Sequence, residues 1–231
     1  MKWALYERLR AATEAGTSSA VVTRLADGAQ AFFDGEQCEG AIDLTDAQRA
    51  AVRRMLVAGR SGMLPDEQDL FVRSYARAPR LIVVGAAHIS QFLAPMATLG
   101  GFEVIVIDPR RAFASAERFP GVTLMDAWPD EALERLKLDA TTAVVTLTHD
   151  PKLDDPALIA ALQSPAFYVG ALGSKRTHAK RVARLTEAGL ADKVARIHSP
   201  VGLDLGGRAP CEIAVSILSE VIQVRYRGEA A

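Results

Sequence analysis

The sequence is poor in three things: cysteine, long apolar runs and an excess of charge of either sign. Two cysteines, Cys38 and Cys211, in 231 residues are too few for a disulfide framework, so a reducing compartment is expected. The formal net charge of −1 gives no electrostatic footprint for nucleic acid. The apolar runs fall well short of the ~20 residues that span a bilayer. We therefore expect a cytoplasmic protein without nucleic-acid or membrane partners.

The first 79 residues have the pattern of a small α+β domain. Asp27-Gly28 between two apolar segments is typical of a hairpin turn. Thr45 and Gln48 form a capping-box pattern at the start of a helix that runs to Gly59. The predicted helices cover residues 3–15 and 45–59, and the predicted strands cover 19–26, 29–34 and 69–76. Because proline disfavours helix in the residue before it, Ala78-Pro79 marks a boundary between domains of residues 1–79 and 80–231.

From residue 80 onward, strand and helix patterns alternate. The strands are nearly continuous apolar runs, as expected for parallel strands that are covered on both faces. They are predicted at residues 81–85, 103–108, 122–126, 142–149 and 166–172. The helices are predicted at residues 88–99, 129–136, 155–163, 175–188 and 210–226. The pattern predicts an α/β fold with a C-terminal Rossmann-like parallel sheet and helices on both faces.

The segment LIVVGAAHISQFLAPMATLGGFEVIVID, residues 81–108, has the order of the first β-α-β unit of a dinucleotide-binding fold. This order predicts a phosphate at Gly85 and a ribose at Asp108. A standard fingerprint has a second glycine where Ala87 stands, and that glycine lets the backbone approach a pyrophosphate closely. The sequence therefore leaves two interpretations, a bound nucleotide or a Rossmann scaffold used for another ligand.

Two charged or titratable side chains stand beside this fingerprint. His88 lies at the start of the helix and could meet an anion or a partner, or be merely accommodated. Arg110 and Arg111 follow the predicted ribose acid and could hold a phosphate, or could be solvated charges in a turn.

The fourth predicted strand ends in a polar cluster. Ligands of open α/β sheets bind outside the carboxyl ends of the strands. There, His149 could exchange a proton near neutral pH, and Asp150 could orient its ring. These two residues are the candidate catalytic pair. We expect Asp154 or Asp155 to cap the next helix, which needs no ligand.

The fifth predicted strand runs into a turn that resembles an anion site. Gly173 and Ser174 precede a helix whose first N–H groups lie at the positive end of its dipole. Lys175 and Arg176 add positive charge. The alternative is a simple helix cap with exposed basic side chains.

A glycine-rich loop over residues 200–209 precedes the last helix. This loop, with Asp204, could close over a ligand. Cys211 would have a somewhat acidified thiol near the helix start, but we expect a structural role for it.

Five segments of residues 80–231 carry a resemblance to a known family. They are LIVVGAAHISQFLAPMATLGGFEVIVIDPR, RFPGV, AVVTLTHDPKLDDPAL, FYVGALGSKRTHAKR and RIHSPVGLDLGGRAPCEIAVSILSEV. Together they resemble the XdhC/CoxI family, the accessory factors of xanthine dehydrogenase and related molybdenum hydroxylases. The resemblance implies a small N-terminal domain and a C-terminal Rossmann domain, commonly in a homodimer. It also implies a protein that binds the molybdenum cofactor (molybdopterin), supports its sulfuration with a cysteine desulfurase as sulfur donor, and delivers it to a hydroxylase client.

On that resemblance, residues 173–176 would hold the pterin phosphate and the edge at His149 and Asp150 would face the cofactor. Family members carry a glycine-rich segment with a cysteine suspected of touching the metal centre. The corresponding Cys38-Glu39 pair is present here, but the glycines before it are missing. Cys38 is therefore either a metal-proximal thiolate or an ordinary, partly exposed cysteine.

Three functions remain for the structure to weigh. The first is a non-catalytic carrier of the molybdenum cofactor. The second is an oxidoreductase that uses NAD or NADP at Gly85 and Asp108, with His149 as proton donor. The third is a protein-binding scaffold in which Trp3, Phe32 and Phe33 supply an apolar patch.

Overall fold

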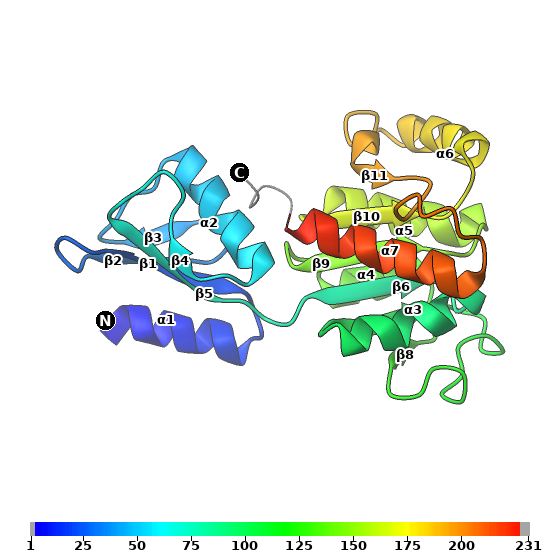
Figure 1. Ribbon diagram of the computed structural model, residues 1–231, viewed down its shortest axis with the longest axis horizontal. Coiled ribbons are helices and arrows are strands. Elements are labelled where there is room, and N and C mark those ends of the chain that lie inside the picture. Colours follow the sequence, from blue (N-terminus) through cyan, green and yellow to red (C-terminus); the bar gives the residue numbers. More distant parts are fainter. Residues whose placement is uncertain (1–2, 227–231) are drawn as a thin grey trace. The chain divides into compact units, whose positions relative to one another are not determined.

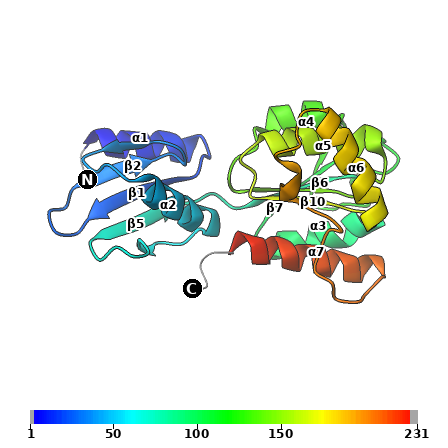
Figure 2. The ribbon, with the colours of Figure 1, turned by 90° about the horizontal axis from the view of Figure 1, so that it is seen from above.

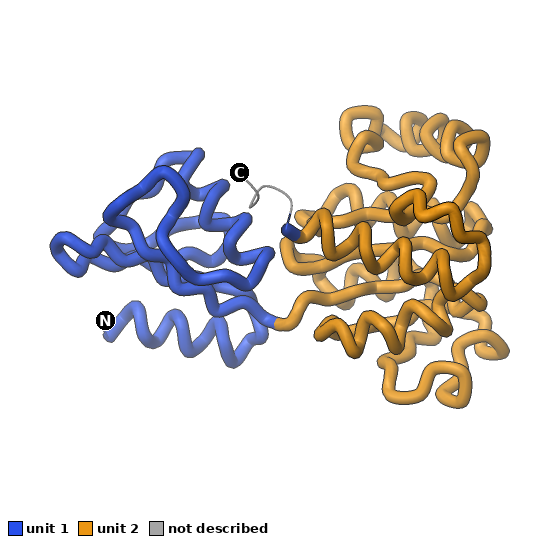
Figure 3. The backbone as a smooth tube through the Cα atoms, in the orientation of Figure 1, with its two compact units in different colours: residues 1–77, 226–231 blue, residues 78–225 orange. Residues whose placement is uncertain are grey.

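The computed structural model describes residues 3–226, which form two compact units (Figure 3). Within the described residues, one unit consists of residues 3–77 with Tyr226, and the other of residues 78–225. Each unit has its own sheet and its own hydrophobic core. No helix in residues 3–226 is long and apolar enough to cross a membrane.

The first unit is an antiparallel sheet with a helix on each face (Figure 1). Its strands, in spatial order, are β3 (Cys38–Gly40), β2 (Gln30–Phe33), β1 (Ser19–Arg24), β5 (Leu70–Tyr75) and β4 (Gly62–Met63). Its helices are α1 (Trp3–Glu14) and α2 (Asp46–Ala58). Because side chains alternate along a strand, Ala20 and Val22 join the core under α2, while Val21 joins the core under α1.

The local signals in this unit act as the sequence indicated. Thr45 and Gln48 form both hydrogen bonds of the capping box, and Gly59 ends α2 with a φ of 70°. The hairpin between β1 and β2 turns at Gly28, which also has a positive φ. These turn and cap predictions are confirmed.

The second unit is a six-stranded parallel sheet. Its strands, in spatial order, are β8 (Thr123–Met125), β7 (Glu103–Ile107), β6 (Arg80–Val84), β9 (Thr142–Thr146), β10 (Tyr168–Ala171) and β11 (Ile197–His198). This confirms the predicted fold class. The sequence pattern missed β11, because a strand of two residues gives no periodicity.

Helices cover both faces of the parallel sheet, as Figure 2 shows. One face carries α3 (His88–Leu99) and α7 (Pro210–Arg225). The other carries α4 (Pro129–Leu136), α5 (Pro151–Gln163) and α6 (Lys175–Glu187), with the short 3₁₀ helix η1 (Val194–Arg196) before β11. The strands between them are buried on both faces, which explains their continuous apolar sequences.

The strand order places a switch point between β6 and β9. These strands are neighbours in the sheet, but α3 follows β6 on one face and α5 follows β9 on the other. In open α/β sheets, ligands bind at the carboxyl edge where the chain divides in this way. The turns after β6, β7, β9 and β10 therefore define where a site is to be sought.

Candidate functional site

The turn after β6 packs directly against the turn after β9. Gly85 has a φ of 109°, and a Cβ atom there would lie 2.5 Å from Cγ2 of Thr148. Glycine is thus required at position 85 by contact with the chain itself. Ala87 is the N-cap of α3 and makes no side-chain cap bond, and His88 is exposed beside it.

Asp108, which the sequence assigned to a ribose, is fully buried and bound within the protein. Its carboxylate accepts hydrogen bonds at 2.8 Å from the Ala86 N–H and from Nε and Nη2 of Arg110. Burial opposes ionisation of Asp108, but the bonds from Arg110 and Ala86 outweigh it and hold its pKa below the ordinary value. A ribose would have to displace Arg110 to reach this acid.

The turn after β9 presents His149 to solvent in a left-handed conformation, with a φ of 63°. Such backbone is uncommon outside glycine and is found disproportionately at functional sites. Asp150 follows as the N-cap of α5, and its Oδ1 accepts the Lys152 N–H at 2.9 Å. The helix begins at Pro151, so the prediction that Asp154 or Asp155 caps it was wrong.

The two later acids of this segment form ion pairs with α6. Asp154 is buried, accepts a 2.6 Å hydrogen bond from the Thr148 hydroxyl and lies 3.7 Å from Nη2 of Arg181. Burial raises the pKa of Asp154 despite these partners. Asp155 forms a two-point ion pair with Arg184, one bond of which is 2.9 Å long.

The turn after β10 begins α6 as the sequence indicated. Ser174 is the N-cap, and its hydroxyl accepts the Thr177 N–H at 3.2 Å. Gly173 has a φ of 142° and packs against Thr177. The two basic residues that follow separate: Arg176 lines a pocket together with His149, whereas Lys175 does not line it.

That pocket, here called the α5–α6 pocket, lies between the start of α5 and one face of α6 and has a volume of about 320 Å³. The residues that line it are His149, Pro151, Asp154, Arg176, Thr177, Lys180, Arg181 and Arg184. Sequence reasoning found His149 and Arg176 but missed Lys180 and the two later arginines. The four-residue spacing of Arg176, Lys180 and Arg184, which places them on one helix face, was the available signal.

The glycine-rich loop before α7 is held by acids of its own helix. Oε2 of Glu220 accepts the Gly202 N–H at 2.8 Å and the Tyr168 hydroxyl at 2.5 Å. Glu212 accepts two backbone N–H groups at the other end of the loop. Asp204 is exposed, accepts only a long 3.3 Å bond from Gly206, and does not line the α5–α6 pocket.

Cys38 lies on β3 in the first unit and is half-buried. Its thiol lies 3.6 Å from the Ile42 carbonyl oxygen, and burial raises its pKa, which disfavours the thiolate that binds metals. Within residues 3–226 no group of three or more His, Cys, Asp or Glu side chains could hold a metal ion. The role of Cys38 at a metal centre stays a prediction.

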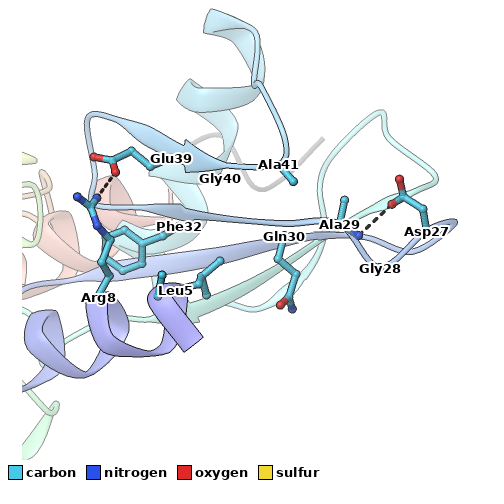
Figure 4. A pocket seen from close by; sticks show the side chains of 11 residues that line it. Leu5, Arg8, Asp27, Gly28, Ala29, Gln30, Phe32, Glu39, Gly40 and Ala41 are labelled. Carbon is cyan, nitrogen blue, oxygen red and sulfur yellow. Dashed lines mark hydrogen bonds and ion pairs between the residues drawn. The ribbon is translucent and has the colours of Figure 1, made fainter. Parts of the chain in front are cut away.

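The first unit has a hollow of its own between α1 and the hairpin (Figure 4). Its charged groups are internally paired: Arg8 with Glu39, and Asp27 with the Ala29 N–H. Phe32 lines it but is 5% exposed, and Phe33 is fully buried in the other core. The predicted apolar patch of Trp3 with these two phenylalanines was therefore wrong.

The strand order, the glycine turn and the basic pocket at the carboxyl edge define a Rossmann-type ligand-binding domain. The family of the XdhC Rossmann domain matches residues 81–221, so the chain belongs to the XdhC family.

Relatives of known name agree with this membership. The chain is 29% identical over 96% of its length to a probable xanthine dehydrogenase component of Bacillus subtilis, and 33% identical over 65% of its length to the molybdenum cofactor insertion chaperone PaoD of Escherichia coli. It spans 65% and 41% of the lengths of these two proteins. A crystal structure described as a xanthine dehydrogenase from Bacillus halodurans is similar over 96% of this chain and 67% of that one, with 25% identity and a TM-score of 0.64.

Proposed function

We propose that this protein binds the molybdenum cofactor and acts as an accessory factor in the maturation of a molybdenum hydroxylase. The observation that carries the proposal is the cationic start of α6 beside His149 at the carboxyl edge of the sheet. A pterin cofactor with a phosphate group suits this edge, because helix N-termini and arginine side chains both bind phosphate. The names of its XdhC-family relatives support the same role.

The residues present fit such a group. The N–H groups of the first turn of α6, the Gly173–Ser174 turn and the side chains of Lys175 and Arg176 would hold the phosphate. His149 and the loop around Asp204 would face the rest of the ligand. When bound, the cofactor supplies the molybdenum centre that the client enzyme uses. The chain's own residues bind, orient and shield it.

The finer parts of the proposal concern partners. Support of sulfuration with a cysteine desulfurase as donor, delivery to a client of the xanthine dehydrogenase or CO dehydrogenase type, and assembly as a homodimer are proposed on the family resemblance. Each has a direct measurement: persulfide transfer to the bound cofactor, reactivation of an apo-hydroxylase, and mass in solution.

An NAD(P)-dependent oxidoreductase is the alternative, and the strand order of the sheet favours it. The internal contacts of Asp108 with Arg110 and Ala86 count against it, because they occupy the ribose acid. Native mass spectra of the anaerobic protein with molybdenum cofactor or with NAD(P) distinguish the two. A stoichiometric mass gain with the pterin alone supports the carrier, and a gain with the dinucleotide alone refutes it.

Replacing Lys175 and Arg176 together by alanine should strongly weaken cofactor retention without unfolding the second unit, because both side chains are exposed. Arg135→Ala is the matched control, since Arg135 is exposed in the last turn of α4 and does not line the α5–α6 pocket. Equal retention by the double variant and the control would refute the assignment of the α6 start.

A further inference from the structure

The α5–α6 pocket holds more positive charge than its acids neutralise. Arg184 is paired with Asp155, and Arg181 with Asp154. Arg176 and Lys180 form no ion pair with any residue that the structure describes, and both line the pocket. Two cationic side chains are therefore left over in one concave space.

Helix geometry brings these charges together. Arg176, Lys180 and Arg184 recur every four residues and share one face of α6, which looks toward the start of α5. The positive end of the α6 dipole lies at the same end of the helix as Arg176. A cluster of like charges is costly unless an anion compensates it.

Arg181 provides a second, independent observation. Its side chain is 2% exposed and lines the pocket, and its guanidinium donates to the Leu172 carbonyl oxygen at 2.9 Å and to Ser199 Oγ at 3.4 Å. Its Nε–H is buried and has no hydrogen-bond partner among the described residues. Buried donors in folded proteins almost always have an acceptor, so this group indicates one that the chain itself does not supply.

We propose that the α5–α6 pocket binds the phosphate monoester of a ligand as a dianion. Two uncompensated cations, Arg176 and Lys180, match a charge of about −2, and guanidinium groups bind phosphate oxygens in a fixed, two-point geometry. Arg181 adds the donor that lacks an acceptor. A nucleic acid would need an extended basic surface rather than a pocket of about 320 Å³.

This inference uses the proposed function only in choosing the pterin phosphate as the source of the anion. It also changes the emphasis of that proposal, since Lys180 joins Arg176 as the main contact and Lys175 contributes little. The anion site itself can be tested without the cofactor.

The first experiment titrates the full chain with inorganic phosphate by calorimetry. Lys180→Gln and Arg176→Gln should each weaken binding by about tenfold or more, as expected for loss of one charge-assisted hydrogen bond. Lys175→Gln is the matched control, because Lys175 is an exposed neighbour on the same helix turn that does not line the pocket, and it should change the affinity by less than about twofold. Absence of phosphate binding to the unaltered protein, or equal weakening by all three variants, would overturn the proposal.

The second experiment identifies the source of the phosphate by competition with molybdopterin or with AMP. Displacement of inorganic phosphate by molybdopterin supports both the pocket and the proposed function. Displacement by AMP alone supports the phosphate site and refutes the cofactor role. Failure of both to compete overturns the assignment of a phosphate ester. Arg181→Gln, checked for folding by circular dichroism, should weaken phosphate binding as well.

Discussion

Asp108 occupies the position of a ribose-binding acid but serves the protein's own structure. It ties the turn after β6, through Ala86, to the turn after β7, through Arg110. The sequence position alone could not reveal this, because a motif fixes where an acid stands and not which donor reaches it first. The same physical chemistry, two or three donors on one buried carboxylate, fits either role.

Replacing Asp108 by asparagine should lower the free energy of unfolding of the second unit by about 1–3 kcal/mol at pH 7, since a buried, charge-assisted contact is lost. The depressed pKa of Asp108 means that its carboxylate stabilises the fold above the ordinary value of 3.8, and that this contribution is lost as the pH falls through the folded-state pKa. Urea unfolding of both proteins should therefore show a difference that narrows below pH 3.8. A difference independent of pH would contradict the ionic role.

The contact between Gly85 and Thr148 gives a second test at the residue scale. Gly85→Ala should destabilise the second unit by the cost of a left-handed alanine, about 1–2 kcal/mol, plus about 1–3 kcal/mol for overpacking against Thr148. Gly101→Ala is the control, because Gly101 also has a positive φ but a Cβ there meets nothing within 4 Å. Similar unfolding midpoints for the two variants would contradict the steric argument.

At the scale of elements, regular patterns were predictable and their junctions were not. Helices α3 and α4 begin and end where the apolar spacing predicts. The start of α5 was misplaced because the segment contains two Asp-Pro pairs, Asp150-Pro151 and Asp155-Pro156, and either pair suits a helix start. Tertiary contacts decide between them: Arg181 and Thr148 hold Asp154 within the helix.

The α5–α6 pocket was only half predicted for a related reason. The residues at strand ends, such as His149, follow from the rule that sites lie at the carboxyl edge. Lys180 and Arg181 lie one or more turns into α6, and only the packing of α6 against α5 brings them to that edge. Sequence periodicity gives the face of a helix but not its neighbour.

The cap of α5 separates a structural role for Asp150 from a chemical one. Asp150→Ala should destabilise the second unit by about 1 kcal/mol, while Asp150→Asn, which keeps a capping oxygen, should cost only a few tenths. Thermal unfolding measures both. If Asp150→Asn abolished cofactor retention while leaving the melting temperature unchanged, the carboxylate would have a binding role beyond the cap.

At the scale of the whole molecule, the described chain holds two units whose apolar clusters share no residue. Leu158→Ala, in the core under α5, should destabilise the second unit by about 2–5 kcal/mol. Hydrogen exchange should then show faster exchange of the amides of β6 and β9 and unchanged protection of β1 and β5. Equal loss of protection in both sheets would show that the units unfold as one.

The close approach of Gly85 to Thr148 also gives the molecule an internal reporter. The Gly85 amide donates to the Ile107 carbonyl oxygen at 2.8 Å and touches the residue before His149. Glycine amide resonances usually fall in their own region of a nitrogen–proton correlation spectrum. A ligand that shifts the turn after β9 would therefore move one readily assigned peak, so occupancy of the carboxyl edge can be followed without a label on the ligand.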